Sequence, residues 1–236
     1  VRMNKSINTS IDEVLHKGTT SLDASTFKNM SEQKDILVID TRSKESYINE
    51  GTVPGSWYIG IDGNFAPWVG AIISDINQKI IFIADDELRV NEIVTRFSRV
   101  GYDHTLGYLN GGIDGWKTQD FDVDYIGSVS AAQFTDMLAK GSMEKPIDVR
   151  RESEYLSEHV LGVANFPLDF IHTNFAEIDP KKEYFLHCKT GYRSLIASSI
   201  FKAKGVKKVT DIRGGYKAIK ETKAILSNFV CPTTIL

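Results

Sequence analysis

An internal repeat is the feature that most constrains how this chain can fold. The same pattern of apolar runs and polar turns occurs twice, about 107 residues apart. In the first copy an apolar run ends in Asp-Thr-Arg at 40–42, and in the second copy the corresponding run ends in Asp-Val-Arg at 148–150. Because a repeat of this length matches the usual size of a domain, the sequence predicts two similar domains. Their predicted extents are 21–126 and 127–236, preceded by an N-terminal linker segment at 1–20.

Each copy alternates short apolar runs with segments of helical periodicity. Residues 36–39 and 80–83 are predicted to be buried strands, and residues 92–100 a helix that ends at Gly101. Continuous apolar strands separated by helices are typical of a parallel sheet with both faces covered. The predicted class is therefore α/β, with a central, mainly parallel sheet and helices on both faces of it in each domain. Binding sites in such sheets lie beyond the carboxyl ends of the strands, which points to the loops after Ile83 and Leu186.

The overall composition argues against several classes of function. A formal net charge of −3 and a pI near 6.0 give no basis for nucleic-acid binding. No apolar run approaches the ~18 residues that a membrane-spanning helix needs, so we expect no membrane partner. The polar start of the chain lacks the apolar core of an export signal, and two cysteines are too few for a disulfide framework. We therefore expect a cytoplasmic location.

The loop after Leu186 in the second copy contains a cysteine in a polar, glycine-containing setting. A strand ends at Leu186 and a helix is predicted over 194–201, so the loop between them can turn its backbone N–H groups inward. Together with the positive end of the helix, these amides form an anion cradle that favours a reactive thiolate. An inert buried cysteine is the alternative, but the polar neighbours of Cys188 argue against it. The predicted site consists of the nucleophile Cys188 and the loop residues Lys189, Thr190, Gly191, Tyr192 and Arg193.

The loop after Ile83 in the first copy has lost these properties. We align Asp85 with Cys188, which makes this loop one residue shorter, and it contains no glycine. Its carboxylates, from Asp85 to Glu87, would repel an anionic substrate and cannot carry sulfur, so the first domain is predicted to be catalytically silent. A metal site in this acidic cluster is the alternative. It is the less favoured interpretation, because consecutive acidic residues in a loop are more often solvated or cap a helix.

Other residues are assigned supporting roles. Asp148 and Arg150 are expected to form a buried ion pair that holds the loops around the site. His159 is either a structural hydrogen-bonding residue or a group at the edge of the pocket. Cys231 could resolve a persulfide on Cys188, but a bystander thiol is favoured.

Taken in order and spacing, these motifs resemble the rhodanese family of sulfurtransferases. The resemblance covers about 200 residues in two copies, and the loop from Cys188 to Arg193 is its most specific part. Leu161 stands where the family usually has proline, and Ile219 stands where Trp116 stands in the first copy. Both departures concern packing. The second-copy motifs are Asp148-Val149-Arg150, Glu154-Tyr155, His159 to Gly162, Cys188 to Ser194 and Gly214-Gly215.

The resemblance implies a sulfurtransferase that moves sulfane sulfur from thiosulfate or a low-molecular-weight persulfide to a thiophilic acceptor. A persulfide on Cys188 would carry the sulfur, with small sulfur compounds as partners and no cofactor or metal in this chain. Phosphatases of a similar fold place five residues between cysteine and arginine, whereas four separate Cys188 from Arg193. The resemblance implies that the shorter loop suits a single sulfur atom. A phosphatase, an arsenate reductase and a non-catalytic binding module remain the alternatives.

One segment of the first copy suggests a wider context. Residues 60–70 interrupt this copy, are expected to have no counterpart in the second, and resemble a segment of bacterial fusion proteins. In those proteins a metallo-β-lactamase-fold persulfide dioxygenase precedes two rhodanese domains, and residues 1–18 resemble the linker that leaves it. The five histidines here are scattered, so the dioxygenase iron would belong to that other domain. Within the segment, Phe65 and Trp68 are interpreted as packing residues.

Overall fold

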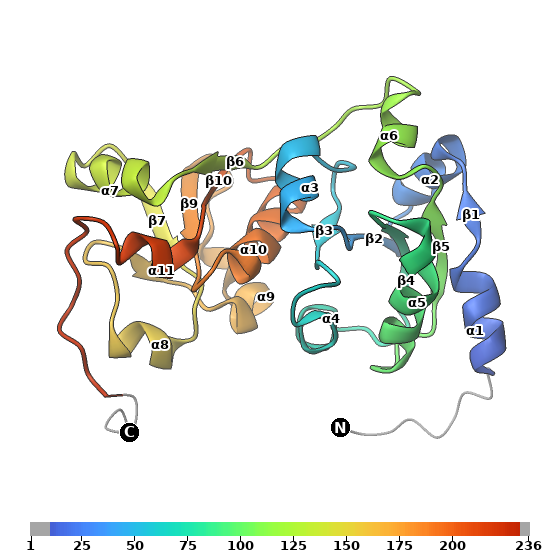
Figure 1. Ribbon diagram of the computed structural model, residues 1–236, viewed down its shortest axis with the longest axis horizontal. Coiled ribbons are helices and arrows are strands. Elements are labelled where there is room, and N and C mark those ends of the chain that lie inside the picture. Colours follow the sequence, from blue (N-terminus) through green and yellow to red (C-terminus); the bar gives the residue numbers. More distant parts are fainter. Residues whose placement is uncertain (1–9, 232–236) are drawn as a thin grey trace. The chain divides into compact units, whose positions relative to one another are not determined.

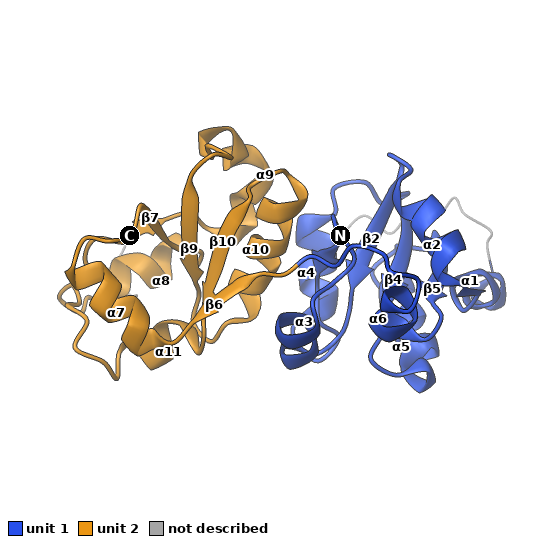
Figure 2. Cartoon of the chain, turned by 90° about the horizontal axis from the view of Figure 1, so that it is seen from above, with its two compact units in different colours: residues 1–124 blue, residues 125–236 orange. Residues whose placement is uncertain are grey.

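The computed structural model describes residues 10–231, and Figure 1 shows the order of their helices and strands. The chain divides into two compact units, residues 1–124 and 125–236 (Figure 2). Each unit contains a five-stranded sheet in which every pairing is parallel. The predicted α/β class and the two-domain repeat are therefore confirmed. Within residues 10–231, no helix has the length and apolar character needed to cross a membrane.

In the first unit the strands lie in the order β1-β5-β4-β2-β3. The central strand β4 is apolar and its last four residues are buried, as a parallel strand covered on both faces requires. Side chains of Ser10, Asp23 and Ser43 cap the first three helices by accepting backbone N–H groups. The strands are β1 (Ser21–Leu22), β2 (Ile36–Asp40), β3 (Trp57–Tyr58), β4 (Lys79–Ile83) and β5 (Thr105–Leu109). The helices are α1 (Ile11–Gly18), α2 (Ala24–Ser31), α3 (Lys44–Glu50), α4 (Phe65–Ile72), η1 (Glu87–Arg89), α5 (Val90–Ser98) and α6 (Gly112–Lys117).

Helix α1 changes the predicted limits of the first domain. The sequence analysis assigned residues 1–20 to a linker, of which 1–9 lie outside the described residues. Residues 11–18 form α1, which contacts α5 and β5. A Cβ atom on Gly18 would lie 2.4 Å from Oγ1 of Thr105, so the helix packs directly on the sheet. This part of the predicted linker is therefore an element of the first unit.

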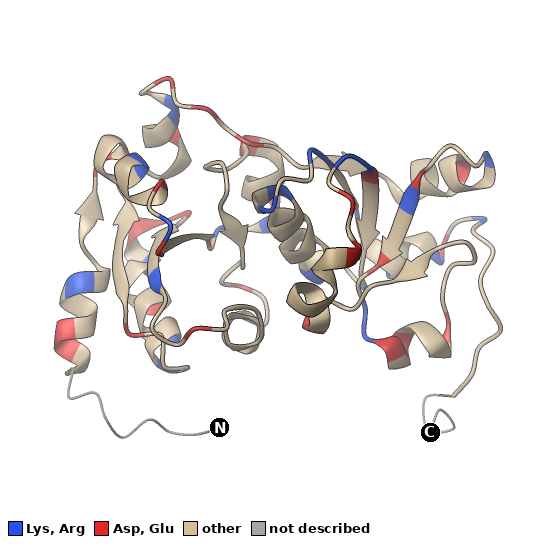
Figure 3. Ribbon diagram, turned by 180° about the vertical axis from the view of Figure 1, so that it is seen from behind, with Lys and Arg blue, Asp and Glu red and all other residues tan. Residues whose placement is uncertain are grey.

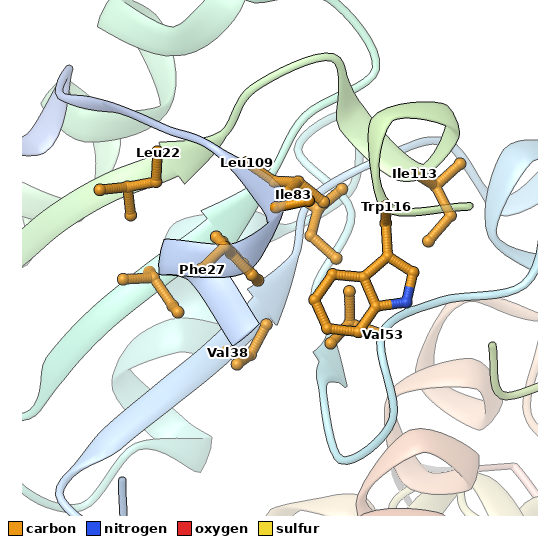
Figure 4. Packing of buried hydrophobic residues seen from close by; sticks show 10 residues of the cluster. Leu22, Phe27, Val38, Val53, Ile83, Leu109, Ile113 and Trp116 are labelled. Atoms are coloured by element: carbon orange, nitrogen blue, oxygen red, sulfur yellow. The ribbon is translucent and has the colours of Figure 1, made fainter. Parts of the chain in front are cut away.

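A hydrophobic cluster holds α2 and α6 against the sheet of the first unit. Figure 4 shows its labelled members, among them Phe27 from α2 and Trp116 from α6. Their rings meet edge to face with centroids 6.3 Å apart, and Nε1 of Trp116 donates to the carbonyl of Asp122. This packing fixes the start of α6, where Gly111 and Gly112 lie beside the loop that follows β4.

The second unit repeats the same topology, with the strand order β6-β10-β9-β7-β8. Lysine, arginine, aspartate and glutamate residues are spread along both units (Figure 3). The strands are β6 (Gly127–Val129), β7 (Lys145–Asp148), β8 (Ala164–Asn165), β9 (Glu183–His187) and β10 (Lys208–Ile212). The helices are α7 (Ala131–Ala139), α8 (Glu152–Ser157), η2 (Leu168–Phe170), α9 (Ile171–Asn174), η3 (Phe175–Glu177), α10 (Tyr192–Ala203) and α11 (Gly215–Ile219).

The segment at 60–70 does have a counterpart in the second unit. It leads into α4, which follows β3, and both Phe65 and Trp68 are buried there, in agreement with the packing interpretation. At the same place in the second unit, between β8 and β9, the chain forms η2, α9 and η3. The expectation that the segment is unique to the first copy was therefore wrong. The two connections share a position in the topology but little sequence, so the repeat could not be seen there.

Candidate active site

The register of the sheets defines which residues of the two units are equivalent. Asp40 pairs with Ile83 at the end of β4, and Asp148 pairs with His187 at the end of β9. The next residue in each loop is therefore Ala84 in the first unit and Cys188 in the second. The same spacing holds through the following helices, where the carbonyls of Phe97 and Phe201 accept equivalent turn hydrogen bonds.

This equivalence corrects the alignment made from sequence. Ala84, and not Asp85, takes the place of Cys188, and the two loops have the same length. Asp85 is equivalent to Lys189, and Arg89 to Arg193. The error arose because the ends of the strands are set by sheet register, which the local sequence does not show. The absence of a nucleophile from the first unit stands, because alanine replaces the cysteine.

Cys188 lies directly after β9 and is 1% exposed. Its Sγ accepts a hydrogen bond from the backbone N–H of Gly191 at 3.2 Å. Gly191 has a φ of +101°, a conformation that suits glycine and lets the loop turn its amide toward the sulfur. Helix α10 begins at the next residue, so the positive end of a 12-residue helix faces the same loop. The sulfur of Cys188 therefore faces a backbone N–H group and the start of a helix.

Helix α11 holds the loop from the other side. The backbone N–H groups of Tyr216 and Lys217 donate to the carbonyls of Cys188 at 2.6 Å and Lys189 at 3.0 Å. A Cβ atom on Gly215 would lie 2.4 Å from the carbonyl oxygen of Cys188, and the φ of Gly215 is +57°. Glycine is needed here for close approach as well as for conformation. The Gly-Gly pair therefore positions the nucleophile loop.

Arg193 is held by an acidic partner on α8. Its two terminal nitrogens contact the two carboxylate oxygens of Glu154 at 2.5 and 2.9 Å. Burial opposes the charge of Arg193, but the hydrogen bonds and charge of Glu154 outweigh it, and the pKa of the guanidinium is raised. Burial likewise opposes ionisation of Glu154, yet Arg193 keeps the pKa of that carboxyl below its ordinary value. The charge of Arg193 is thus paired with Glu154, while Lys189 is exposed.

A second network fixes the carbonyl of Gly191. Ser194, at the start of α10, donates its hydroxyl toward that carbonyl at 3.2 Å and toward Oδ1 of the buried Asp211 at 2.5 Å. Both side chains are fully or almost fully buried. Asp211 lies on β10, next to β9, so the sheet itself holds the turn at Gly191. Sequence analysis did not single out Asp211, because one acidic residue in a strand carries no distinctive pattern.

The supporting pair Asp148 and Arg150 is buried beneath the loop. Arg150 donates to both carboxylate oxygens, the shortest contact being 2.6 Å, and its own backbone N–H donates to Oδ1 of Asp148. The guanidinium also lies over the ring of Tyr216, 3.9 Å from its centroid. The first unit repeats this arrangement with Asp40 and Arg42. The motif is therefore structural, since it occurs with and without a cysteine.

Tyr216 is a site residue that sequence reasoning missed. Its hydroxyl donates to Oε2 of Glu158 at 2.6 Å, and the same oxygen pairs with Lys220 at 2.5 Å. Its backbone N–H holds the carbonyl of Cys188, so one residue links the nucleophile, the buried Arg150 and the surface. An aromatic residue directly after the Gly-Gly pair was the available signal. The burial of Tyr216, followed by the hydrogen bond to Glu158, raises the pKa of its phenol.

The two nearby histidines have different surroundings. His187 is fully buried, and burial lowers its pKa. Its Nδ1 lies 3.4 Å from the carbonyl of Cys188, and its Nε2 has no hydrogen-bond partner among residues 10–231. His159 stacks on the ring of Tyr155 at 3.9 Å, and its Nδ1 lies 2.8 Å from the carbonyl of Tyr155. These contacts give His159 a role in packing α8.

Neither unit shows a metal centre in its described part. In the stretch from residue 10 to residue 231, no group of three or more His, Cys, Asp or Glu side chains is placed to hold an ion. The acidic loop after β4 instead forms helix caps and turns, with Asp86 accepting the N–H of Leu88. Cys231 is exposed, whereas Cys188 is buried.

Comparison with known proteins identifies the family to which the two domains of this chain belong. A family model described as "Rhodanese-like domain" matches residues 23–119 and again residues 130–222. These two stretches include most of the chain. The chain belongs to the rhodanese-like domain family and contains the domain twice, which agrees with the resemblance stated from its sequence motifs.

Individual relatives match parts of the chain. It is 32% identical over 71 residues to "Uncharacterized protein YqhL" of Bacillus subtilis (strain 168), covering 30% of this chain and 56% of that protein. It is 28% identical over 92 residues to "Putative sulfur carrier protein YrkF" of the same organism, covering 39% and 50%. The chain thus spans about half the length of these curated relatives.

Solved structures are similar to the chain at low identity. A rhodanese-related protein from Thermoplasma volcanium is 23% identical with a TM-score of 0.38, over 43% of this chain and 97% of that one. A thiosulfate sulfurtransferase from Pseudomonas aeruginosa is 15% identical with a TM-score of 0.38, over 89% of this chain and 44% of that one.

Proposed function

We propose that the second unit is a sulfurtransferase that carries sulfane sulfur as a persulfide on Cys188. The observation that carries the proposal is the placement of the buried Sγ at the start of a four-residue loop, 3.2 Å from the Gly191 amide and next to the start of α10. This loop is the most specific motif shared with the family. A rhodanese domain fits such an activity.

The reaction is a double displacement. The thiolate of Cys188 attacks the outer sulfur of thiosulfate or of a low-molecular-weight persulfide. A new S–S bond forms to Cys188 as the donor S–S bond breaks, and sulfite or a thiolate leaves with the electron pair. An acceptor thiolate, or cyanide in an assay, then attacks the terminal sulfur and releases Cys188 as the thiolate. No metal or cofactor is required by these steps.

The pairing of Arg193 favours sulfur transfer over phosphate chemistry. A phosphatase needs its loop arginine to grip a tetrahedral oxyanion, with two parallel N–H groups directed at its oxygens. Here both terminal nitrogens of Arg193 are directed at Glu154. Thiosulfate turnover should therefore exceed turnover of an aryl phosphate or arsenate. The opposite ranking would favour the phosphatase or arsenate reductase alternative.

Mass spectrometry of the intact protein tests the assignment. After exposure to thiosulfate or glutathione persulfide, we expect the mass of one added sulfur atom on Cys188. The Cys188→Ser variant should lose both the adduct and turnover, while Cys231→Ser, which removes the exposed cysteine, should keep them. Turnover retained in Cys188→Ser would refute the proposal. A protein in which Cys188 takes up no sulfur would favour a non-catalytic binding module.

We further propose that this activity operates beside a persulfide dioxygenase domain in a reducing, cytoplasmic compartment. The resemblance of residues 60–70 to such fusion proteins and the need for a free thiol at Cys188 support this proposal. The chain itself should transfer sulfur from glutathione persulfide without consuming oxygen. Oxygen uptake by this chain would argue against a separate dioxygenase domain.

A further inference from the structure

The first unit has kept an open cleft at the place where the second unit has its nucleophile. This cavity has a volume of about 550 Å³ and is lined by Ala84, which is equivalent to Cys188, and by the turn at Gly111 and Gly112. A volume of this size lies in the range of small-molecule sites. Alanine replaces the cysteine in this cleft, so the role to be tested for it is binding.

Two residues that line the cleft differ in size from their equivalents in the second unit. Ser46 in the first unit is equivalent to Glu154 in the second, and Ile113 is equivalent to Tyr216. In the second unit the carboxylate of Glu154 holds Arg193, and the ring of Tyr216 lies against the guanidinium of Arg150. In the first unit the equivalent arginine, Arg89, pairs instead with Asp62 and Glu92. The first-unit cleft is therefore lined by smaller side chains at these two positions, and the equivalent arginine is held by other partners.

The charge of the cleft is reversed relative to the second unit. Asp85 replaces Lys189 and Asp114 replaces Lys217, and Glu50 and Glu87 also line the cavity. Arg42 is its one lining cation among the described residues, and it is already paired with Asp40 and Glu50. The local field therefore favours cations.

Two backbone N–H groups near the cleft already donate hydrogen bonds to carboxylates of this chain, so they are not available to bind an anion. Oδ2 of Asp85 accepts the N–H of Ser43 at 2.6 Å, and Oε1 of Glu87 accepts the N–H of Gly111 at 3.4 Å. The carboxylate of Asp114 has no hydrogen bond or ion pair with any other residue in the described range. Ala84, Leu109 and Ile113 add an apolar wall to the cavity. The lining thus combines uncompensated negative charge with a surface suited to methylene groups.

We propose that the cleft of the first unit is a binding site for a small organic cation, an alkylammonium or guanidinium compound with a short aliphatic chain. The ammonium group lies between Asp85 and Asp114, and the methylene groups lie against Ala84 and Ile113. The residues of this site belong to the first unit and Cys188 belongs to the second, so binding at this site does not require sulfur transfer.

Calorimetric titration of the full chain with spermidine, near physiological ionic strength, tests this proposal. We expect one saturable site, and about tenfold or more weaker affinity in the double variant Asp85→Asn with Asp114→Asn. The matched control, Asp136→Asn with Glu144→Gln, removes the same charge from exposed positions of the second unit and should bind as the unaltered chain does. Backbone NMR signals of Gly111 and Gly112 should shift on binding, while thiosulfate should not shift them.

Three results would overturn the proposal. These are the absence of saturable binding, equal weakening in both double variants, and shifts confined to the second unit. Circular dichroism of each variant verifies that it is folded. Because the altered residues are outside the nucleophile loop, sulfur uptake by Cys188 should be unchanged in all of them.

Discussion

Replacing Gly215 by alanine tests how closely α11 must approach the loop that carries Cys188. The added Cβ would lie 2.4 Å from the carbonyl oxygen of Cys188 and 2.9 Å from the carbonyl carbon of Lys189. Both neighbours are backbone atoms, which cannot move aside as a side chain can. We expect α11 to shift away from the loop and to weaken the two hydrogen bonds from Tyr216 and Lys217.

The expected magnitude follows from two contributions. A left-handed conformation costs an alanine about 1 kcal/mol relative to glycine. Each lost backbone hydrogen bond adds about 1 kcal/mol. Gly215→Ala should therefore lower the free energy of unfolding by about 3 kcal/mol and reduce sulfur transfer, because the nucleophile loop loses its support.

Gly141 provides a matched control. Its φ of +62° is close to the +57° of Gly215, but a Cβ atom there would meet nothing within 4 Å. Gly141→Ala should therefore cost only about 1 kcal/mol and leave turnover unchanged.

Urea unfolding followed by circular dichroism is the suitable assay, because Trp57, Trp68 and Trp116 all lie in the first unit, whereas Gly215 lies in the second. Equal losses of stability in the two variants would refute the close approach of α11. Unchanged turnover in Gly215→Ala would refute its role in holding the loop.

Three further predictions concern charge and pH. Glu154→Gln should destabilise the fold by about 2 kcal/mol at pH 7, because Arg193 keeps half of its hydrogen bonds but loses its counter-charge. Since the pKa of Glu154 is lowered in the fold, this difference should shrink as the pH falls below about 4, and a constant gap in urea unfolding would contradict the ion pair. Burial lowers the pKa of His187, so the unfolded chain takes up its proton first as the pH falls below about 6.5. Stability should therefore decrease with acidification more steeply in the unaltered chain than in His187→Leu, whereas parallel pH profiles would count against a neutral buried imidazole. Asp85→Ala should leave thiosulfate turnover within about twofold, because the first unit lacks the nucleophile, and a large loss in a steady-state assay would show that this unit takes part in the chemistry.

Much of the architecture could be predicted from local patterns. The apolar runs that became β2 and β4, and the glycine-containing loop before α10, are visible because burial on both faces demands uninterrupted apolar residues. The twofold repeat then indicated two domains. Helix α1 was not predicted because most of its residues are polar. The close contact that Gly18 makes with Thr105 of the sheet can be seen only in the tertiary structure.

The sequence by itself determined the candidate nucleophile and its loop, because Cys188, Gly191 and Arg193 are close neighbours whose spacing is visible without tertiary information. Only the tertiary structure decided what surrounds them. The fold pairs Arg193 with Glu154 and packs Gly215 and Tyr216 against the carbonyl of Cys188. The register of the strands makes Ala84 the equivalent of Cys188 in the first unit. These relations join residues that are far apart in the chain or depend on strand register. Such contacts depend on how strands pair and helices pack, so they cannot be predicted from the residues of one loop.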